Sequence, residues 1–243
     1  MLKRNVILLS VLIVIAGSIH AQVRPGIKLG YNLSGVAASY TGTSEIKSTA
    51  AGDPNNFRMK SGFQTGMVVD CPINDAWAVQ PGVRFTSQGF IDKYTGNGKS
   101  VRKFALYSLQ IPVYAQYRLN IAEEINLLFQ AGPYVGLGLF GRQKYTRKGK
   151  SVDLEDKQKK ITFGGGTSND IHKAFDYGIG AGAGIEFYRF QFMVAYDLGL
   201  YDASFDKKEA KSASYNVDMR NRNLSITLAF IFGRKDPLQN KKD

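Results

Sequence analysis

Gly178, Gly180 and Ala183 have the G-x-G-x-x-G/A spacing of a dinucleotide-binding turn. In that motif a strand precedes the glycines and a helix follows them, so that the phosphates meet the helix N-terminus. Here a strict alternation of residue types continues as far as Phe187, which predicts one uninterrupted strand and no helix. We therefore predict no cofactor-binding residues, and expect these glycines to make room for larger side chains inside a narrow fold.

Phosphate-binding loops and metal sites are equally poorly matched. The segments 98–100 and 149–151 resemble the end of a phosphate-binding loop, but Lys93 and Lys144 stand where its first glycine belongs. We interpret both segments as turns. One Cys and one His outside the N-terminal leader leave no zinc site. The acids within 153–156 lack calcium-loop spacing, so we predict no metal ligands.

A hydrolytic site is the remaining catalytic possibility. Ser168 and Asp170 precede His172 within one long connection, and a nucleophile with a histidine base is the usual equipment of a lipid-modifying enzyme. Neighbours in a loop seldom form a triad, however, so we interpret all three as solvated loop residues. The prediction is that the chain has no catalytic residues and is not an enzyme.

Any site must be positioned by strands, and the segment 175–200 shows this most clearly. It reads FDYGIGAGAGIEFYRFQFMVAYDLGL, in which two runs of strict alternation follow one another almost directly. A period of two places alternate residues on opposite faces of a strand. One face of each run is fully apolar, with aromatic residues near its ends, which suits contact with lipid. We interpret this segment as a hairpin of a transmembrane β-barrel.

The same alternation recurs along the chain and predicts eight strands, near 26–34, 62–71, 76–87, 104–119, 125–140, 175–187, 190–200 and 223–232. Their connections are alternately long and short. In outer-membrane barrels the outer loops are long, the periplasmic turns are short, and an even strand count closes the sheet without a free edge. The predicted fold is all-β, an eight-stranded antiparallel up-and-down barrel. A soluble β-sandwich or lipocalin-like barrel is the alternative.

The N-terminus has the pattern of an export signal: Lys3 and Arg4, then an apolar stretch at 6–16, then a small-residue cleavage site before Gln22. We expect residues 1–21 to be a signal peptide, 22–234 the barrel and 235–243 a charged periplasmic tail. The net charge of +12 then becomes +10.

Cys71 is the only cysteine, so no disulfide forms within the chain. Its position on an apolar face of a strand suggests that it packs as a small hydrophobic residue.

In the order and spacing of five motifs the chain resembles the PorT-like outer-membrane β-barrel family, often labelled porin family protein. The motifs are GIKLGYNLSG, SLQIPVYAQYRL, QAGPYVGLGL, DYGIGAGAGIEF and NLSITLAFIFG, which lie at 26–35, 108–119, 130–139, 176–187 and 223–233. The resemblance implies an eight-stranded outer-membrane barrel without catalytic residues. The founding member belongs to the type IX secretion machinery. Unlike many outer-membrane strands, which end on a terminal aromatic residue, this chain continues for eleven residues beyond Phe232.

Charges on the faces predicted to point inward form the first group of site residues. An eight-stranded barrel has an interior that side chains just fill, and buried charges need partners. We expect a salt-bridged plug rather than a wide channel, with a proton or ion path as the alternative. The predicted network comprises Lys28, Asp70, Arg84, Arg118, Asp176, Glu186 and Asp197.

A basic stretch in the longest connection, 142–160, forms the second group. It is either a solvated surface or a contact for lipopolysaccharide phosphates or an acidic protein, and no aromatic-interleaved groove suggests nucleic acid. Its cations are Arg142, Lys144, Arg147, Lys148, Lys150, Lys157, Lys159 and Lys160.

The predicted function of the protein is a structural or protein-interaction role, including an accessory role in a type IX-like secretion system. The alternatives are a small transporter or channel, a lipid-modifying barrel enzyme and a soluble lipocalin-like binder. The expected partners are outer-membrane lipid, lipopolysaccharide and other outer-membrane or secretion-system proteins.

Overall fold

The computed structural model describes residues 23–41, 57–94, 100–147, 159–161, 174–201 and 216–233. All regular structure in these ranges is β-strand, and none of their residues form a helix that could cross a membrane. The strands are β1 (Arg24–Thr41), β2 (Phe57–Pro72), β3 (Trp77–Tyr94), β4 (Ser100–Ala122), β5 (Ile125–Arg147), β6 (Lys159–Ile161), β7 (Phe175–Phe187), β8 (Phe190–Gly199) and β9 (Asn216–Ile231).

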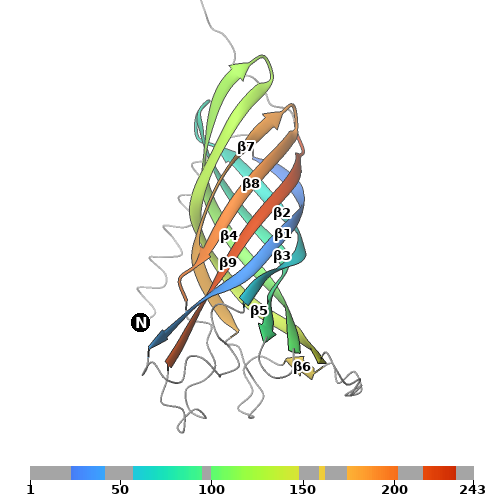
Figure 1. The fold of residues 1–243 in the computed structure, drawn as a ribbon. Coiled ribbons are helices and arrows are strands. Elements are labelled where there is room, and N and C mark those ends of the chain that lie inside the picture. The colour runs from blue at the N-terminus through green and yellow to red at the C-terminus, as the bar shows by residue number, and fades with distance from the viewer. Residues whose placement is uncertain are drawn as a thin grey trace, which may run out of the picture.

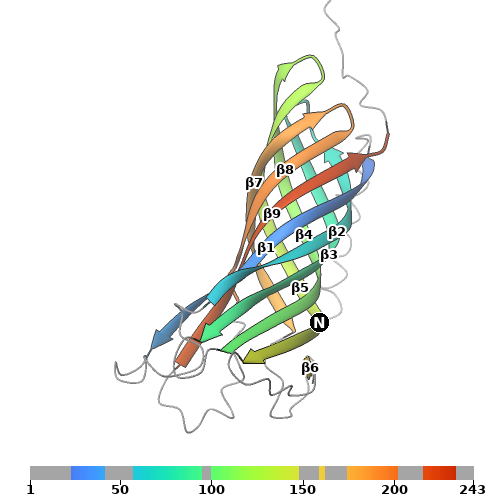
Figure 2. The same cartoon turned by 45° about the vertical axis from the view of Figure 1, so that its right-hand side comes forward.

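Eight of these strands close into a ring of antiparallel neighbours (Figures 1 and 2). The sheet order β4-β3-β2-β1-β9-β8-β7-β5-β6 is completed by the pairing of β4 with β5. Strand β6 is a short addition that pairs with the far end of β5 outside the ring. The predicted eight-stranded up-and-down barrel is therefore confirmed. Closure leaves the ring itself without a sheet edge, as a lipid environment demands.

The two ends of the barrel differ. Three tight connections lie at one end, which we call the turn end: residues 73–76, 123–124 and 188–189. Glu124 and Tyr188 adopt positive φ angles of 64° and 54°, which allows the chain to reverse within two residues. The first residues of β1 and the last of β9 are paired at this end, through Gly26 and Ile231. We call the opposite end the loop end.

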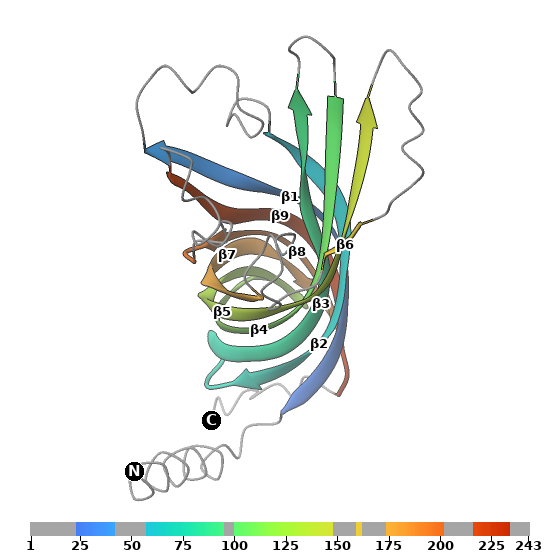
Figure 3. The ribbon, with the colours of Figure 1, turned by 90° about the horizontal axis from the view of Figure 1, so that it is seen from below.

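At the loop end the strands are longer than the alternation predicts. Strand β3 continues to Tyr94, and strand β4 begins already at Ser100. The two strands therefore form a hairpin over most of the loop expected at 88–103. Likewise β1, β2, β5 and β9 extend into stretches expected to be loops. Figure 3 shows the ends of β3, β4 and β5 standing apart from those of β1 and β9. These extensions were missed because polar residues interrupt the alternation and irregular register occurs between Met59 and Gln64 and at Tyr107.

Outward-facing residues between the two ends are almost all apolar. Large side chains such as Leu29, Met67 and Ile179 are 61%, 66% and 51% exposed in the isolated chain, as expected of side chains that face lipid. Aromatic contacts form a band near each end of this surface. Trp77 packs on Tyr117 at the turn end, with ring centroids 5.0 Å apart, and Tyr107 stacks on Phe140 towards the loop end at 4.6 Å. Such aromatic girdles mark the two membrane interfaces.

Candidate functional site

The barrel interior is polar and filled by side chains. Every strand that alternates apolar residues outward turns its intervening residues inward, and glutamine recurs there more than any other polar type. The buried inward residues include Asn32, Gln64, Asp70, Gln80, Gln110, Gln116, Arg118, Asn126, Gln130, Glu186, Gln191, Asp197 and Asn223. These residues come from all eight long strands, and several groups of hydrogen bonds among them link opposite walls.

Near the turn end, Asp70 is the centre of an ionic cluster. Its carboxylate is fully buried and accepts hydrogen bonds from both Arg24, at 3.0 Å from Nε, and Arg118, at 2.5 Å. Arg118 also donates to Glu186 at 3.4 Å. Glu186 in turn accepts from Asn126 at 3.0 Å and from Gln191 at 2.8 Å. The cluster therefore alternates positive and negative groups across β1, β2, β4 and β7, which offsets the cost of burying each charge.

A second ion pair lies farther along the interior. Arg84 binds Asp197 at 2.6 Å and the Gln110 side-chain oxygen at 2.7 Å. Tyr114 donates to the other Asp197 oxygen at 3.1 Å, and the Arg84 guanidinium also lies 5.7 Å from the centre of the Tyr134 ring. These contacts join β3, β4, β5 and β8, so the pair holds opposite walls of the barrel together.

The other two predicted charges have neutral partners. Asp176 accepts hydrogen bonds from Tyr134 at 3.4 Å and from Asn221 at 3.0 Å. Lys28 donates to the side-chain oxygen of Gln80 at 3.2 Å. The structure thus places all seven predicted residues in the interior and joins five of them in ion pairs. Arg24 was missed because the first strand was expected to begin at residue 26, although the spacing of residues 24, 26 and 28 continues the inward face.

Inward glycines create the space for this network. A Cβ atom on Gly178 would lie 2.7 Å from the Tyr134 ring, and one on Gly180 would lie 2.8 Å from the Tyr114 hydroxyl. Both glycines belong to the continuous strand β7, which has no helix after it. The glycines that resemble a nucleotide motif therefore accommodate aromatic side chains, as the alternation suggested.

A small cavity lies among these side chains. It has a volume of about 30 Å³, and its lining combines apolar residues with the polar groups of Lys28, Gln64, Arg84, Tyr114 and Gln130. Both polar atoms of the Gln64 amide and the Gln130 oxygen are buried without a protein partner. A cavity of this size has room for one or two water molecules, which would satisfy such atoms.

Replacing Lys28 with methionine is expected to change the free energy of unfolding by less than about 1 kcal/mol. Lys28 has a neutral hydrogen-bond partner and takes part in none of the ion pairs among the described residues. Methionine has a similar volume and removes a charge that is costly to hold in the interior. Urea titration of the barrel in lipid vesicles, followed through the single tryptophan Trp77, measures the change. A loss above about 2 kcal/mol would show that the ammonium is needed for folding.

The predicted basic loop is in part a hairpin, which corrects the sequence expectation. Arg142, Lys144 and Arg147 belong to β5, and Lys159 and Lys160 belong to β6, where Lys160 is paired with Arg142. Lys148, Lys150 and Lys157 lie outside the described residues. The hairpin forms because β5 continues beyond the membrane band, where its unpaired edge forms hydrogen bonds with the short strand β6.

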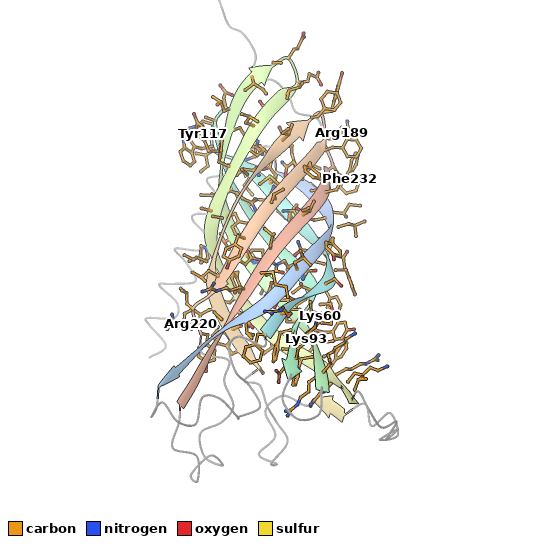
Figure 4. The ribbon with its side chains drawn as sticks, viewed as in Figure 1. Lys60, Lys93, Tyr117, Arg189, Arg220 and Phe232 are labelled. Atoms are coloured by element: carbon orange, nitrogen blue, oxygen red, sulfur yellow. The ribbon has the colours of Figure 1, made fainter. Side chains whose placement is uncertain are left out.

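Charge is distributed unequally between the two ends. In the described part of the chain, exposed charges at the turn end are Asp75, Glu123, Glu124 and Arg189. Towards the loop end, the exposed charges whose side chains the structure describes are all positive, namely Arg58, Lys93, Lys103, Arg142, Lys144, Arg220 and Arg222. In Figure 4 the labelled Lys93 and Arg220 lie near the loop end, on different sides of the barrel, and Arg189 lies near the turn end. Most of these loop-end cations were not predicted as site residues, because only the strand register shows which cations share a face.

Ser168, Asp170 and His172 lie outside the described residues. Within the described ranges no three His, Cys, Asp or Glu side chains are grouped as metal ligands. Cys71 is a half-buried free thiol.

A closed, polar-filled and apolar-coated antiparallel ring defines the class as a transmembrane β-barrel. The chain belongs to the outer membrane protein beta-barrel domain family, whose model matches residues 17–204. It is therefore an outer-membrane β-barrel protein. A search of curated proteins finds no match.

Solved structures with a similar fold are distant in sequence. Ail, the attachment invasion locus protein of Yersinia pestis, is 13% identical with a TM-score of 0.38, over 86% of this chain and 98% of that one. Neisserial surface protein A is 13% identical with a TM-score of 0.41, over 86% and 97%. The outer membrane enzyme PagL is 10% identical with a TM-score of 0.34, over 82% and 98%. These similarities concern the fold alone.

Proposed function

We propose that this protein is a closed, non-enzymatic outer-membrane barrel that acts as a structural or interaction protein. The observation that supports this most directly is the interior, where ion pairs and glutamine side chains link opposite walls around a cavity of about 30 Å³. A barrel with such a filled interior offers no path for hydrated solutes. Its contribution to the cell must then come from its outer surface, its loops or its ends.

The proposed orientation places the loop end outside the cell and both termini in the periplasm. Short turns at one end and long connections at the other are typical of outer-membrane barrels. The charge distribution agrees, because among the described side chains the exposed cations except Arg189 lie towards the loop end and the exposed acids lie at the turn end. An outer leaflet rich in phosphate groups attracts the cationic end.

The ends of β3, β4 and β5 extend beyond the ring and stand apart from those of β1 and β9 (Figure 3). The inner face of this extension is held by stacked Phe90 and Phe104, with ring centroids 4.5 Å apart, so the hairpin keeps its shape without lipid around it. We propose that this extension contacts other outer-membrane proteins. The resemblance to PorT-like barrels makes components of a type IX-like secretion system the partners to examine, with this chain as an accessory subunit.

Site-specific photo-crosslinking in living cells tests this function. A crosslinking residue in place of Lys93, near the tip of the extension, is expected to give discrete adducts with outer-membrane or secretion proteins. The matched control replaces Arg189, which is exposed at the turn end. Identical adducts from both positions, or none from Lys93, would contradict the interaction proposal.

A membrane-impermeant thiol reagent tests the orientation separately. In intact cells whose protein carries Cys71→Ser, the reagent is expected to label a cysteine placed at Lys93 but not one placed at Arg189.

Planar lipid bilayers containing the purified barrel are expected to show no discrete conductance steps. The reason is that a water-sized cavity does not hold a continuous column of hydrated ions. The variant Arg84→Ala removes the cation that binds Asp197 and Gln110 and serves as a comparison with a loosened interior. Regular conductance steps from the unmodified protein would favour the transporter or channel alternative.

A further inference from the structure

The outer face of the loop-end extension carries five cations on three successive rows of the sheet. Directly paired residues share a face, and residues two apart on a strand share it as well. Lys103 is paired with Ile91 on one side and with Lys144 on the other, and Ile91 is in turn paired with Arg58. The adjacent rows add Arg142, opposite Ala105, and Lys93, opposite Val101. We call this set, Arg58, Lys93, Lys103, Arg142 and Lys144, the basic face.

The basic face begins directly beyond the outer aromatic band. Tyr107, which stacks on Phe85 and Phe140, lies four residues from Lys103 on the same face of β4. Girdle aromatics lie at the level of the lipid headgroups. Each pair of residues along a strand covers about 7 Å, so the cations lie one to three rows farther from the membrane centre. The nearest of these cations therefore lie next to the headgroup level that the aromatic residues mark.

Like charges lie directly opposite each other at the centre of the basic face. Lys103 and Lys144 are directly opposite each other, an arrangement that destabilises a sheet when both residues carry the same charge. All five side chains of the set are exposed. In the described part of this extension the single carboxylate is Asp92, which is buried and paired with Phe57 and Arg102 on the opposite face. Among the described residues, no acid therefore shares that face with Lys103 and Lys144.

The sheet holds these cations at fixed spacing. The opposite face of the same strands packs Phe90 between Phe57 and Phe104, with ring centroids 5.2 Å and 4.5 Å away. Lys103 and Lys144 lie on adjacent strands, which are about 5 Å apart, so both ammonium groups can reach one phosphate. A ligand that is amphiphilic, with an acyl part against the apolar band and a phosphate above the aromatic residues, matches both surfaces at once.

We propose that the basic face binds the phosphate groups of the outer-leaflet glycolipid, with Lys103 and Lys144 as the central pair. Arg58, Lys93 and Arg142 surround this pair and contact the same or neighbouring headgroups. The site is specific to the β2–β5 side of the barrel and is not a general property of the cationic loop end. The proposal rests on the proposed orientation, since only an outward loop end meets this leaflet.

Binding of purified, folded protein to lipid A in detergent micelles tests the site. The double variant Lys103→Gln/Lys144→Gln is expected to bind phosphorylated lipid A roughly tenfold more weakly or worse, and Lys103→Arg/Lys144→Arg is expected to retain binding. The matched control Arg220→Gln/Arg222→Gln removes the same charge elsewhere at the loop end and is expected to stay within about threefold of the original. Dephosphorylated lipid A is expected to bind weakly to all of these proteins.

Equal losses of lipid A affinity in the two double glutamine variants would overturn a specific site at Lys103 and Lys144 and leave only a general electrostatic attraction to the loop end. Unchanged binding in Lys103→Gln/Lys144→Gln, or equal binding of dephosphorylated lipid A, would overturn the proposal altogether. Slower migration after boiling confirms that each variant is folded, and removal of one repelling charge pair is not expected to harm folding. Because the assay uses purified protein, it gives its answer independently of the orientation, the conductance and the crosslinking partners.

Discussion

Replacing Gly132 with valine is expected to prevent formation of the closed barrel. Gly132 faces the interior from β5, opposite Gly180 of β7. A Cβ atom there would overlap the Val113 carbonyl oxygen and lie 2.9 Å from the Tyr114 Cα. Backbone rather than a flexible side chain would have to move, so we expect a loss above about 3 kcal/mol, the upper end of the usual cost of overpacking. The measurement is the gel shift between boiled and unboiled protein from outer membranes.

The neighbouring residue provides the control for this substitution. Ala131 is exposed on the lipid-facing side of the same strand. The variant Ala131→Val adds the same methyl groups towards lipid, which accommodates them, and is expected to fold normally. A Gly132→Val protein that keeps the full shift and the stability of Ala131→Val would show that β4 and β5 are not in the close contact described here.

Replacing Asp70 with asparagine is expected to lower the free energy of unfolding by about 3–5 kcal/mol, because it leaves a buried cation cluster without its central anion. Asp70 accepts from Arg24 and Arg118, and its side chain has no exposed area. Asparagine keeps the volume and removes the charge, so the electrostatic contribution is isolated. Urea titration in vesicles, followed by Trp77 fluorescence, gives the difference.

Two further variants make this prediction specific. Asp75→Asn removes a carboxylate that is exposed at the turn end, and its effect is expected to stay within about 0.5 kcal/mol. Combining Asp70→Asn with Arg24→Gln removes one charge of each sign and is expected to recover part of the loss, as a double-mutant cycle would show. Equal stabilities for Asp70→Asn and Asp75→Asn would mean that water enters the cluster and replaces the missing anion.

Much of the fold could be predicted because a strand exposed to lipid on one side carries its pattern in the sequence. The apolar runs of 175–187 and 190–200 identify lipid-facing residues without knowledge of their neighbours. The strand ends beyond the membrane were not predictable in the same way. At residues 88–106 neither face is uniformly apolar. Phe90 and Phe104 share the inner face with Asp92 and Arg102, and Lys93 and Lys103 share the outer face with Ile91 and Val101, so the pattern of the membrane band is lost.

The sequence by itself determined the number of long strands, the face that each membrane segment turns to lipid, and most of the charged residues that enter the interior. These depend on a period of two, which is local. Only the tertiary structure decided that Asp70 lies between Arg24 and Arg118, that Arg84 binds Asp197, and that Lys103 lies opposite Lys144. Such pairs join residues from different strands, and a shift of register by one residue would separate them. Their partners are therefore settled by closure of the ring, in which every strand is aligned against two neighbours at once.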